Sequence, residues 1–302
     1  MNLITKLLLP LCFLTTLLGA ATPDQEPALK PFVLGTEPKS TDRAQVVLAA
    51  KSALADQGFG VVGSFQPTPD ATVVVVTHDL LKVTAAKTLF GGYGAVVRVA
   101  VTEVHGRLQV SYTNPTYFAA AYRLQDDLSV VRAKLEAALG RQQDFGSEKG
   151  LTAQKLRGYH YTFGMEKFDS LGKHELATFK THAEAVAAVE SGLAAGRAGV
   201  TKVYRVDLPG HEDTLFGVAL AEGQGADKYV LDRIDFAALK STAHLPYEIL
   251  VSGGTVYHLY ARFRIAIDFP DLSMMGRNSF MSIMSAPGAI KEALTAVAAG
   301  GK

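Results

Sequence analysis

The chain has 302 residues, of which 48% are hydrophobic and 20% are charged, and its formal net charge is +1. At roughly 100–200 residues per domain, this length predicts two domains, and the apolar content suffices for two hydrophobic cores. A near-neutral chain without a run of Lys or Arg lacks the clustered basic face that nucleic acid requires, so we expect no nucleic-acid partner.

Residues 1–21 have the pattern of a signal peptide. Lys6 supplies a positive start, residues 7–18 are mostly apolar, and small residues follow at 19–21. An apolar stretch of this length is shorter than the roughly 20 residues that cross a bilayer. We therefore expect cleavage near Ala20 or Ala21, a periplasmic or secreted protein, and no transmembrane segment in the mature chain. An uncleaved anchor is the alternative.

Cys12 is the only cysteine, and it lies inside this segment. A lipoprotein would use it, but Pro10 and Leu11 are not the small residues that lipid modification favours. The mature chain therefore has no disulfide, thiolate ligand or cysteine nucleophile.

The first half of the mature chain predicts helices and strands in alternation. Residues 22–40 contain four prolines and predict an extended leader. The elements that follow are a helix from Thr41 or Asp42 to about Leu54, strands at 59–65 and 73–76, and helices at 79–89 and 128–139. Together they define a first domain at residues 41–140.

A β-hairpin is expected at residues 96–113. Val97, Val99 and Val101 alternate with polar or small residues, which is typical of a strand with one buried face. Gly106 tolerates the positive φ of a tight turn, and Pro115 cannot continue the second strand.

The second half repeats this order. Polar, glycine-punctuated residues 141–156 predict a linker, and residues 157–302 a second domain of similar layout. Its predicted elements are a helix at 182–193, strands at 200–206, 215–220, 247–251 and 255–268, and a helix at 286–298. We therefore predict an α+β fold of two related domains, each an antiparallel sheet packed with two or more helices.

The run VVRVAVTEVHGRLQVSYTNPTYFAAAYRL, preceded by ALADQGFGVV, resembles the DUF302 family, a domain family of unknown function. The resemblance covers residues 41–139, is clearest at Gly58, Phe59 and residues 111–115, and extends in outline to the C-terminal half. Residues 77–79 depart from the Asn-Pro pair that the family carries at that point. The resemblance implies a compact α+β domain with an antiparallel sheet, and it implies no reaction.

Residues 258–264, read as a strand, would place His258, Tyr260, Arg262 and Arg264 on one face. Two arginines beside aromatic rings could clamp a carboxylate or phosphate, because guanidinium offers a bidentate fork. The alternative is a solvated sheet face, or pairing with Asp268, Asp271 or Glu248.

Tyr159 and Tyr161 alternate with polar residues up to Phe163, which predicts a strand with an aromatic face for a ligand, an interdomain contact or a core. Four methionines lie within residues 274–284. Soft thioethers suit Cu(I), while packing beneath the last helix is the alternative. These methionines are Met274, Met275, Met281 and Met284.

No H-E-x-x-H, G-x-S-x-G or Walker motif is present. The leading hypothesis is therefore a non-enzymatic exported module without a cofactor, which binds a small molecule or a protein partner in a groove between its domains, as a monomer or a homo-oligomer. The alternatives are a periplasmic hydrolase or isomerase with a His and carboxylate site assembled in space, and copper handling by methionine. A pocket where His78, His160 or His258 meets a carboxylate would favour the enzyme, and a smooth apolar pocket without ionisable residues would favour binding.

Overall fold

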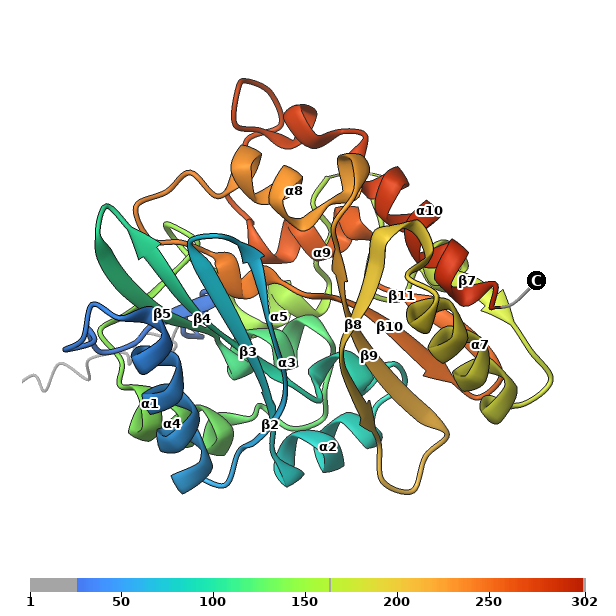
Figure 1. The fold of residues 1–302 in the computed structure, drawn as a ribbon, viewed down its shortest axis with the longest axis horizontal. Helices are drawn as coiled ribbons and strands as arrows, with labels where there is room; N and C mark the ends of the chain where they lie inside the picture. The colour runs from blue at the N-terminus through green and yellow to red at the C-terminus, as the bar shows by residue number, and fades with distance from the viewer. Residues whose placement is uncertain (1–25, 163, 301–302) are drawn as a thin grey trace, which may run out of the picture.

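The computed structural model describes residues 26–300 with the exception of residue 163. The predicted signal peptide and the first residues of the leader lie outside this range. The fold is α+β and contains two antiparallel sheets, which stand side by side in Figure 1. Among the described residues, no helix combines the length and the apolar character needed to cross a membrane.

The first half builds a six-stranded sheet with the order β2-β3-β4-β5-β1-β6. Its elements are β1 (Phe32–Leu34), α1 (Arg43–Asp56), β2 (Gly60–Thr68), β3 (Ala71–Thr77), α2 (Asp79–Ala86), the 3-10 helix η1 (Gly91–Gly94), β4 (Val97–Val104), β5 (Arg107–Thr113), α3 (Pro115–Ala121), α4 (Ser129–Leu139) and β6 (Gln143–Phe145). The predicted cap of α1 is present, because the Asp42 carboxylate accepts a hydrogen bond from the Ala44 N–H at 2.8 Å. The predicted hairpin turn is also present, with φ of 51° at His105 and 75° at Gly106.

The second half builds a five-stranded sheet with the order β7-β11-β10-β9-β8. Its elements are α5 (Ala153–Arg157), α6 (Leu171–His174), β7 (Glu175–Thr178), α7 (His182–Ala194), η2 (Arg197–Gly199), β8 (Val200–Asp207), β9 (Asp213–Leu220), η3 (Gly223–Gly225), α8 (Asp227–Ile234), η4 (Thr242–His244), β10 (Tyr247–Ser252), β11 (Thr255–His258), α9 (Ala261–Asp268), η5 (Phe280–Ile283) and α10 (Ala286–Ala298).

The two halves share one topology. Each runs from a first short strand through a helix, a strand pair, a second helix, a hairpin and two closing helices, from β1 to α4 and from β7 to α10. The sheet orders β2-β3-β4-β5-β1 and β8-β9-β10-β11-β7 correspond strand for strand. The repeat that the sequence shows only as an order of elements is thus present in the pairing of the strands. Residues 141–156, expected to be a linker, hold α5 and the strand β6, which pairs with β1 and widens the first sheet.

Two strand predictions are wrong. The strand expected at 255–268 ends at His258, and the helix α9 follows from Ala261. This run alternates, but its apolar residues Ala261 and Ile265 also recur at helical spacing, and both are fully buried. No strand forms at residues 159–162, which lie in a loop, and Phe163 lies outside the described residues.

The second sheet is buried on both faces. On β9 and β10, Phe216 and Ile249 face the cluster that contains α7 and α10, whereas Leu215 and Leu250 belong to the core of the first half. Strands alternate their side chains, so one sheet joins both cores. The two cores therefore meet across the second sheet.

The first sheet is also covered where the sequence predicts a solvent face. Arg98, Thr102 and Ser111, which alternate with the valines of the hairpin, are all buried. The Thr102 hydroxyl contacts that of Thr242 at 3.1 Å, and residues 235–244 cross this face. The prediction of one buried face is thus wrong, because the second half of the chain covers the other.

The two sheets lie close together at Gly63, where β2 passes β8. A Cβ at Gly63 would lie 2.4 Å from the Val203 carbonyl oxygen and 3.0 Å from the Tyr204 Cβ. We expect Gly63→Ala to destabilise the protein by about 1–3 kcal/mol in urea unfolding, because the two strands would have to separate. Gly60→Ala on the same strand is the matched control, since nothing lies within 4 Å of its Cβ position. Equal losses in the two variants would contradict this account of the contact.

Candidate functional site

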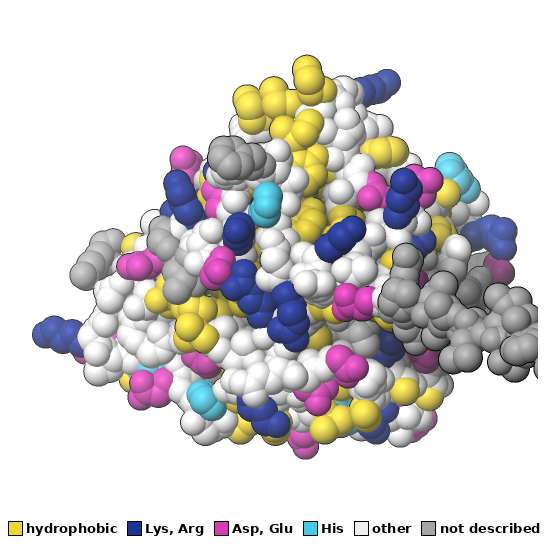
Figure 2. Space-filling view, turned by 180° about the vertical axis from the view of Figure 1, so that it is seen from behind, with side chains coloured by type: hydrophobic (Ala, Val, Ile, Leu, Met, Phe, Trp, Pro, Cys, Tyr) yellow, Lys and Arg dark blue, Asp and Glu magenta, His cyan; other side chains and the backbone are white. Residues whose placement is uncertain are grey.

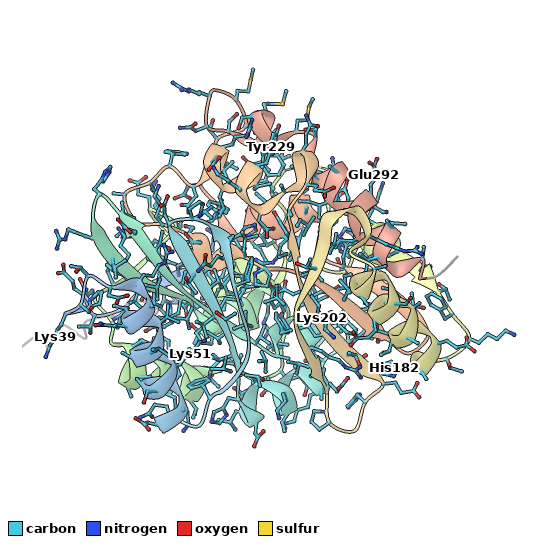
Figure 3. The ribbon with its side chains drawn as sticks, viewed as in Figure 1. Lys39, Lys51, His182, Lys202, Tyr229 and Glu292 are labelled. Atoms are coloured by element: carbon cyan, nitrogen blue, oxygen red, sulfur yellow. The ribbon has the colours of Figure 1, made fainter. Side chains whose placement is uncertain are left out.

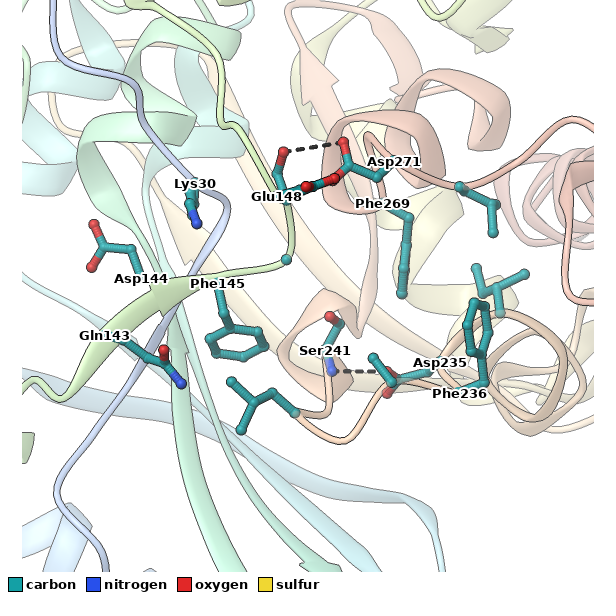
Figure 4. A pocket seen from close by; sticks show the side chains of 16 residues that line it. Lys30, Gln143, Asp144, Phe145, Glu148, Asp235, Phe236, Ser241, Phe269 and Asp271 are labelled. Atoms are coloured by element: carbon teal, nitrogen blue, oxygen red, sulfur yellow. Dashed lines mark hydrogen bonds between the residues drawn. The ribbon is translucent and has the colours of Figure 1, made fainter.

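A pocket of about 400 Å³ opens at the junction of the two halves (Figure 4). This volume lies in the range of small-molecule sites, which are typically about 300–1,000 Å³. Three phenylalanines contribute to its wall: Phe145 from β6, Phe236 from the loop after α8, and Phe269 from the end of α9. The other lining residues are Lys30, Gln143, Asp144, Gly146, Ser147, Glu148, Ile234, Asp235, Ala237, Leu239, Ser241, Asp271 and Leu272.

The pocket exists because residues 235–241 of the second half lie across the first sheet. The Gln109 side chain on β5 holds this loop at two points, donating to the Ala238 carbonyl at 2.8 Å and accepting from the Lys240 N–H at 3.1 Å. The loop therefore forms one wall, and β6 with the residues after it forms the other. Phe236, two residues after the end of α8, is 60% exposed.

Asp235 is the carboxyl group of the loop 235–241. It accepts a hydrogen bond from the Ser241 N–H at 3.0 Å (Figure 4). Burial raises the pKa of Asp235 to about 6, against the opposing effect of that hydrogen bond and of the Lys240 charge. The pocket therefore becomes less negative below about pH 6.

Most other carboxylates of the pocket have protein partners. Asp144 binds Arg132 at 3.0 Å and Arg141 at 2.8 Å, and Asp271 accepts from the Ser147 hydroxyl at 3.1 Å. Among the charged side chains of the pocket that the structure describes, Asp144 alone forms an ion pair, and Lys30, Glu148, Asp235 and Asp271 form none. Aromatic and aliphatic side chains thus supply most of the exposed surface of the wall, while eight of the 16 lining residues are polar or charged and can orient a ligand.

A second polar cluster lies in the core between the halves. Glu248 on β10 binds Arg98 on β4 at 2.6 Å and Arg264 on α9 at 3.4 Å, and all three are nearly inaccessible to solvent. Arg264 also binds Asp268, which contacts the Nδ1 of His244. Two cations face two carboxylates here. Burial lowers the pKa of His244 against the opposing charge of Asp268, which favours its neutral form. This closed, balanced set ties the halves together.

The structure does not assemble the predicted anion clamp. Arg264 points into the core, whereas Arg262, two residues along the helix, binds Glu166 at 2.6 Å. Its guanidinium also lies 5.1 Å from the centre of the Tyr260 ring. The strand geometry behind the clamp is wrong, and the pairing of Arg264 with Glu248 and Asp268, its stated alternative, is what forms. His258 is fully buried.

Tyr159 and Tyr161 are half-buried against the second half. Their hydroxyls donate to the carbonyls of Ala266, at 3.0 Å, and Leu272. Tyr161 also stacks on Phe280, with ring centres 5.1 Å apart. The two tyrosines thus form an intramolecular contact and do not line the junction pocket.

The methionines are not buried. Met274, Met275, Met281 and Met284 are 41–77% exposed, so the packing alternative is wrong for this group. In the described residues no group of three or more His, Cys, Asp or Glu side chains could hold a metal ion.

The histidines do not favour the enzyme hypothesis. His78 caps α2, accepting from the Leu80 N–H at 3.1 Å, and His160 is exposed in a loop. Within the described residues, neither these two nor His258 forms an ion pair with a carboxylate. His244 and Asp268 do pair, but both are 0% exposed, out of reach of a substrate. The junction pocket also departs from the smooth apolar pocket expected for binding, since it contains carboxylates and Lys30.

Sequence reasoning missed the pocket, because its residues come from four separated segments. One signal in the sequence would have found the buried cluster: a charged residue inside an apolar run. Arg98 in VVRVAV and Glu248 in PYEILV are such residues. Comparison of the chain with protein-family models, curated proteins and solved structures finds no match.

Proposed function

We propose that the exported mature chain is a non-enzymatic module that binds a small, largely apolar molecule in the junction pocket. The observation that carries this proposal is a hollow of about 400 Å³ with walls from both halves and with three phenylalanines in its lining. Aromatic and aliphatic walls bind by removing apolar surface from water, and polar groups set the orientation of the ligand. The fixed loop 235–241 makes the site pre-formed.

The free charges of the pocket restrict the ligand. Among the described residues of the wall, the ionic side chains without an ion pair are one cation, Lys30, and three carboxyl groups, Glu148, Asp235 and Asp271. Asp235, whose pKa burial raises to about 6, adds negative charge at neutral pH. A strongly anionic ligand would therefore meet carboxylates, so a neutral or zwitterionic molecule fits better.

The test uses two measurements. Native mass spectrometry of the protein purified from periplasm should show a retained small molecule. Nile red, a neutral apolar dye, should bind with a saturable rise in fluorescence, and Phe236→Ala should weaken its affinity roughly tenfold by removing one aromatic wall.

Phe236 is 60% exposed, so its replacement leaves the core intact. Leu89→Ala is the matched control, because Leu89 is 72% exposed and lies outside the pocket. Dye binding that is not saturable, or that falls equally in both variants, would refute the pocket as the binding site.

A further inference from the structure

The loop between α9 and α10 gathers methionine at one end of the molecule. The chain has six methionines, and four of them lie between residues 274 and 284. Figure 3 shows sulfur-bearing side chains projecting from the top of the molecule, and Figure 2 shows hydrophobic side chains at the same apex from behind. Exposed methionine is uncommon because the thioether side chain normally fills cores.

The backbone brings three of these methionines together. The Met281 N–H donates to the Met274 carbonyl at 3.1 Å, and the neighbouring Phe280 N–H donates to Ser273 at 2.9 Å, so the two segments lie side by side. Met281 and Met284 are three residues apart across the 3-10 helix η5, where side chains at this spacing stack on one side. Met275 adjoins Met274 at the turn.

Core packing does not explain the group. Within η5, Phe280 and Ile283 are 4% and 0% exposed and anchor the segment to the second core. Met281 within η5 and Met284 directly after it are 49% and 67% exposed. The fold is therefore complete without the thioethers.

The chemistry of the donors selects the ligand class. Residues 273–284 contain no Asp, Glu, His or Cys, and Arg277 is their one charged side chain. Thioether sulfur is a soft, uncharged donor that binds Cu(I) and Ag(I), whereas hard cations prefer oxygen ligands such as water. We propose that Met274, Met281 and Met284, assisted by Met275, form a surface site for a monovalent soft metal ion, with Cu(I) as the physiological candidate.

The test uses Ag(I), which needs no reductant, in chloride-free buffer with the mature protein labelled at the methionine methyl carbons. We expect at least three methyl signals of the loop to shift and to saturate at one equivalent of Ag(I). The signal of Met165, which lies outside the loop, should stay unchanged and serves as an internal control. Cu(I) added anaerobically should then be withdrawn from bicinchoninate by the protein.

Substitution of methionine by leucine distinguishes binding by the sulfur atoms from binding by the apolar surface. Leucine keeps the hydrophobic surface and removes the sulfur donor. Replacing all four loop methionines by Leu should abolish saturable binding, and Met281→Leu alone should weaken it by at least about tenfold, as loss of groups around metal sites commonly does. Met165→Leu should bind as the wild type does. A fourfold variant that still binds Ag(I), or shifts that grow without saturating, would overturn the proposal.

Discussion

Arg264→Met is expected to destabilise the protein by about 3–5 kcal/mol, because it leaves two buried carboxylates short of a cation. The Arg264 guanidinium binds Glu248 at 3.4 Å, donates to the His244 carbonyl at 2.6 Å, and pairs with Asp268. Methionine approximates the length of the arginine side chain and fills part of its volume, so the loss reports mainly the charge. Urea unfolding followed by circular dichroism measures it.

A surface arginine provides the matched control. Arg107 pairs with Glu37, but their side chains are 75% and 59% exposed. Water screens such a pair, so Arg107→Met should cost less than about 1 kcal/mol. If both variants lost the same stability, the junction cluster would not hold the halves together in the way its burial implies.

A charge-balanced variant sharpens this test. Arg98 and Glu248 bind each other at 2.6 Å, and removing either one alone leaves the other as a buried charge without this partner. Replacing both by Met removes one cation and one carboxylate and leaves Arg264 with Asp268. We therefore expect the double variant to lose clearly less stability than the sum of the two single variants, which is the signature of a coupled pair. Additive losses would argue against direct coupling.

The same cluster shows what the sequence could and could not predict. The hairpin at 96–113 was predictable because its turn chemistry is local, with His105 and Gly106 both at positive φ. The face that carries Arg98 and Thr102 was not, because what covers it comes from residues about 140 positions later in the chain. Alternation predicts that a strand has two different faces, and it does not predict that both are buried.

The error in the strand predicted at 255–268, which ends at His258, has a similar cause. Its residues alternate between polar and apolar, yet Ala261 and Ile265 also fit one side of a helix. The helix forms because both sides find partners: Ile265 enters the second core, and Arg264 enters the junction. When a short run fits both the strand period and the helix period, tertiary contacts decide which structure forms. The local sequence pattern does not contain these contacts.

Of the candidate sites, the sequence singled out the methionines through composition alone, and their exposure required the structure. The junction pocket left no such trace. The sequence around Lys30, Phe145 and Phe236 contains no binding motif. These residues line one pocket because residues 235–241 cross the first sheet. A site assembled from distant segments can be identified from the structure, but it leaves no motif in the sequence.

Acid should destabilise the protein through His258. This ring is fully buried, and within the described residues its nitrogens form no hydrogen bond. Burial, together with the smaller effects of the His174 and Lys291 charges, lowers the pKa of His258 to about 3, and the nearby Lys173 backbone opposes this shift only in part. An unfolded histidine has a pKa of about 6.5, so the unfolded chain takes up the proton first.

The direction of the pH effect follows from this difference. Above about pH 6.5 the ring is neutral in both states, and its contribution to stability is fully present. As the pH falls from 6.5 toward 3, the unfolded state binds the proton and the folded state does not, which costs about 1.4 kcal/mol for each pH unit. By pH 4.5 the expected loss from His258 alone is about 2–3 kcal/mol.

His258→Phe isolates this contribution from other groups that titrate in the same range, such as His244 and Asp235. Phenylalanine keeps a ring beside Tyr260, whose ring centre lies 5.8 Å away, and it cannot take up a proton. A packing defect would shift the free energy of unfolding by the same amount at every pH, whereas loss of a titrating group changes the slope. We therefore expect the variant to gain about 2–3 kcal/mol on the wild type between pH 7 and pH 4.5. Parallel curves for the two proteins would mean that the buried ring is not what limits stability in acid.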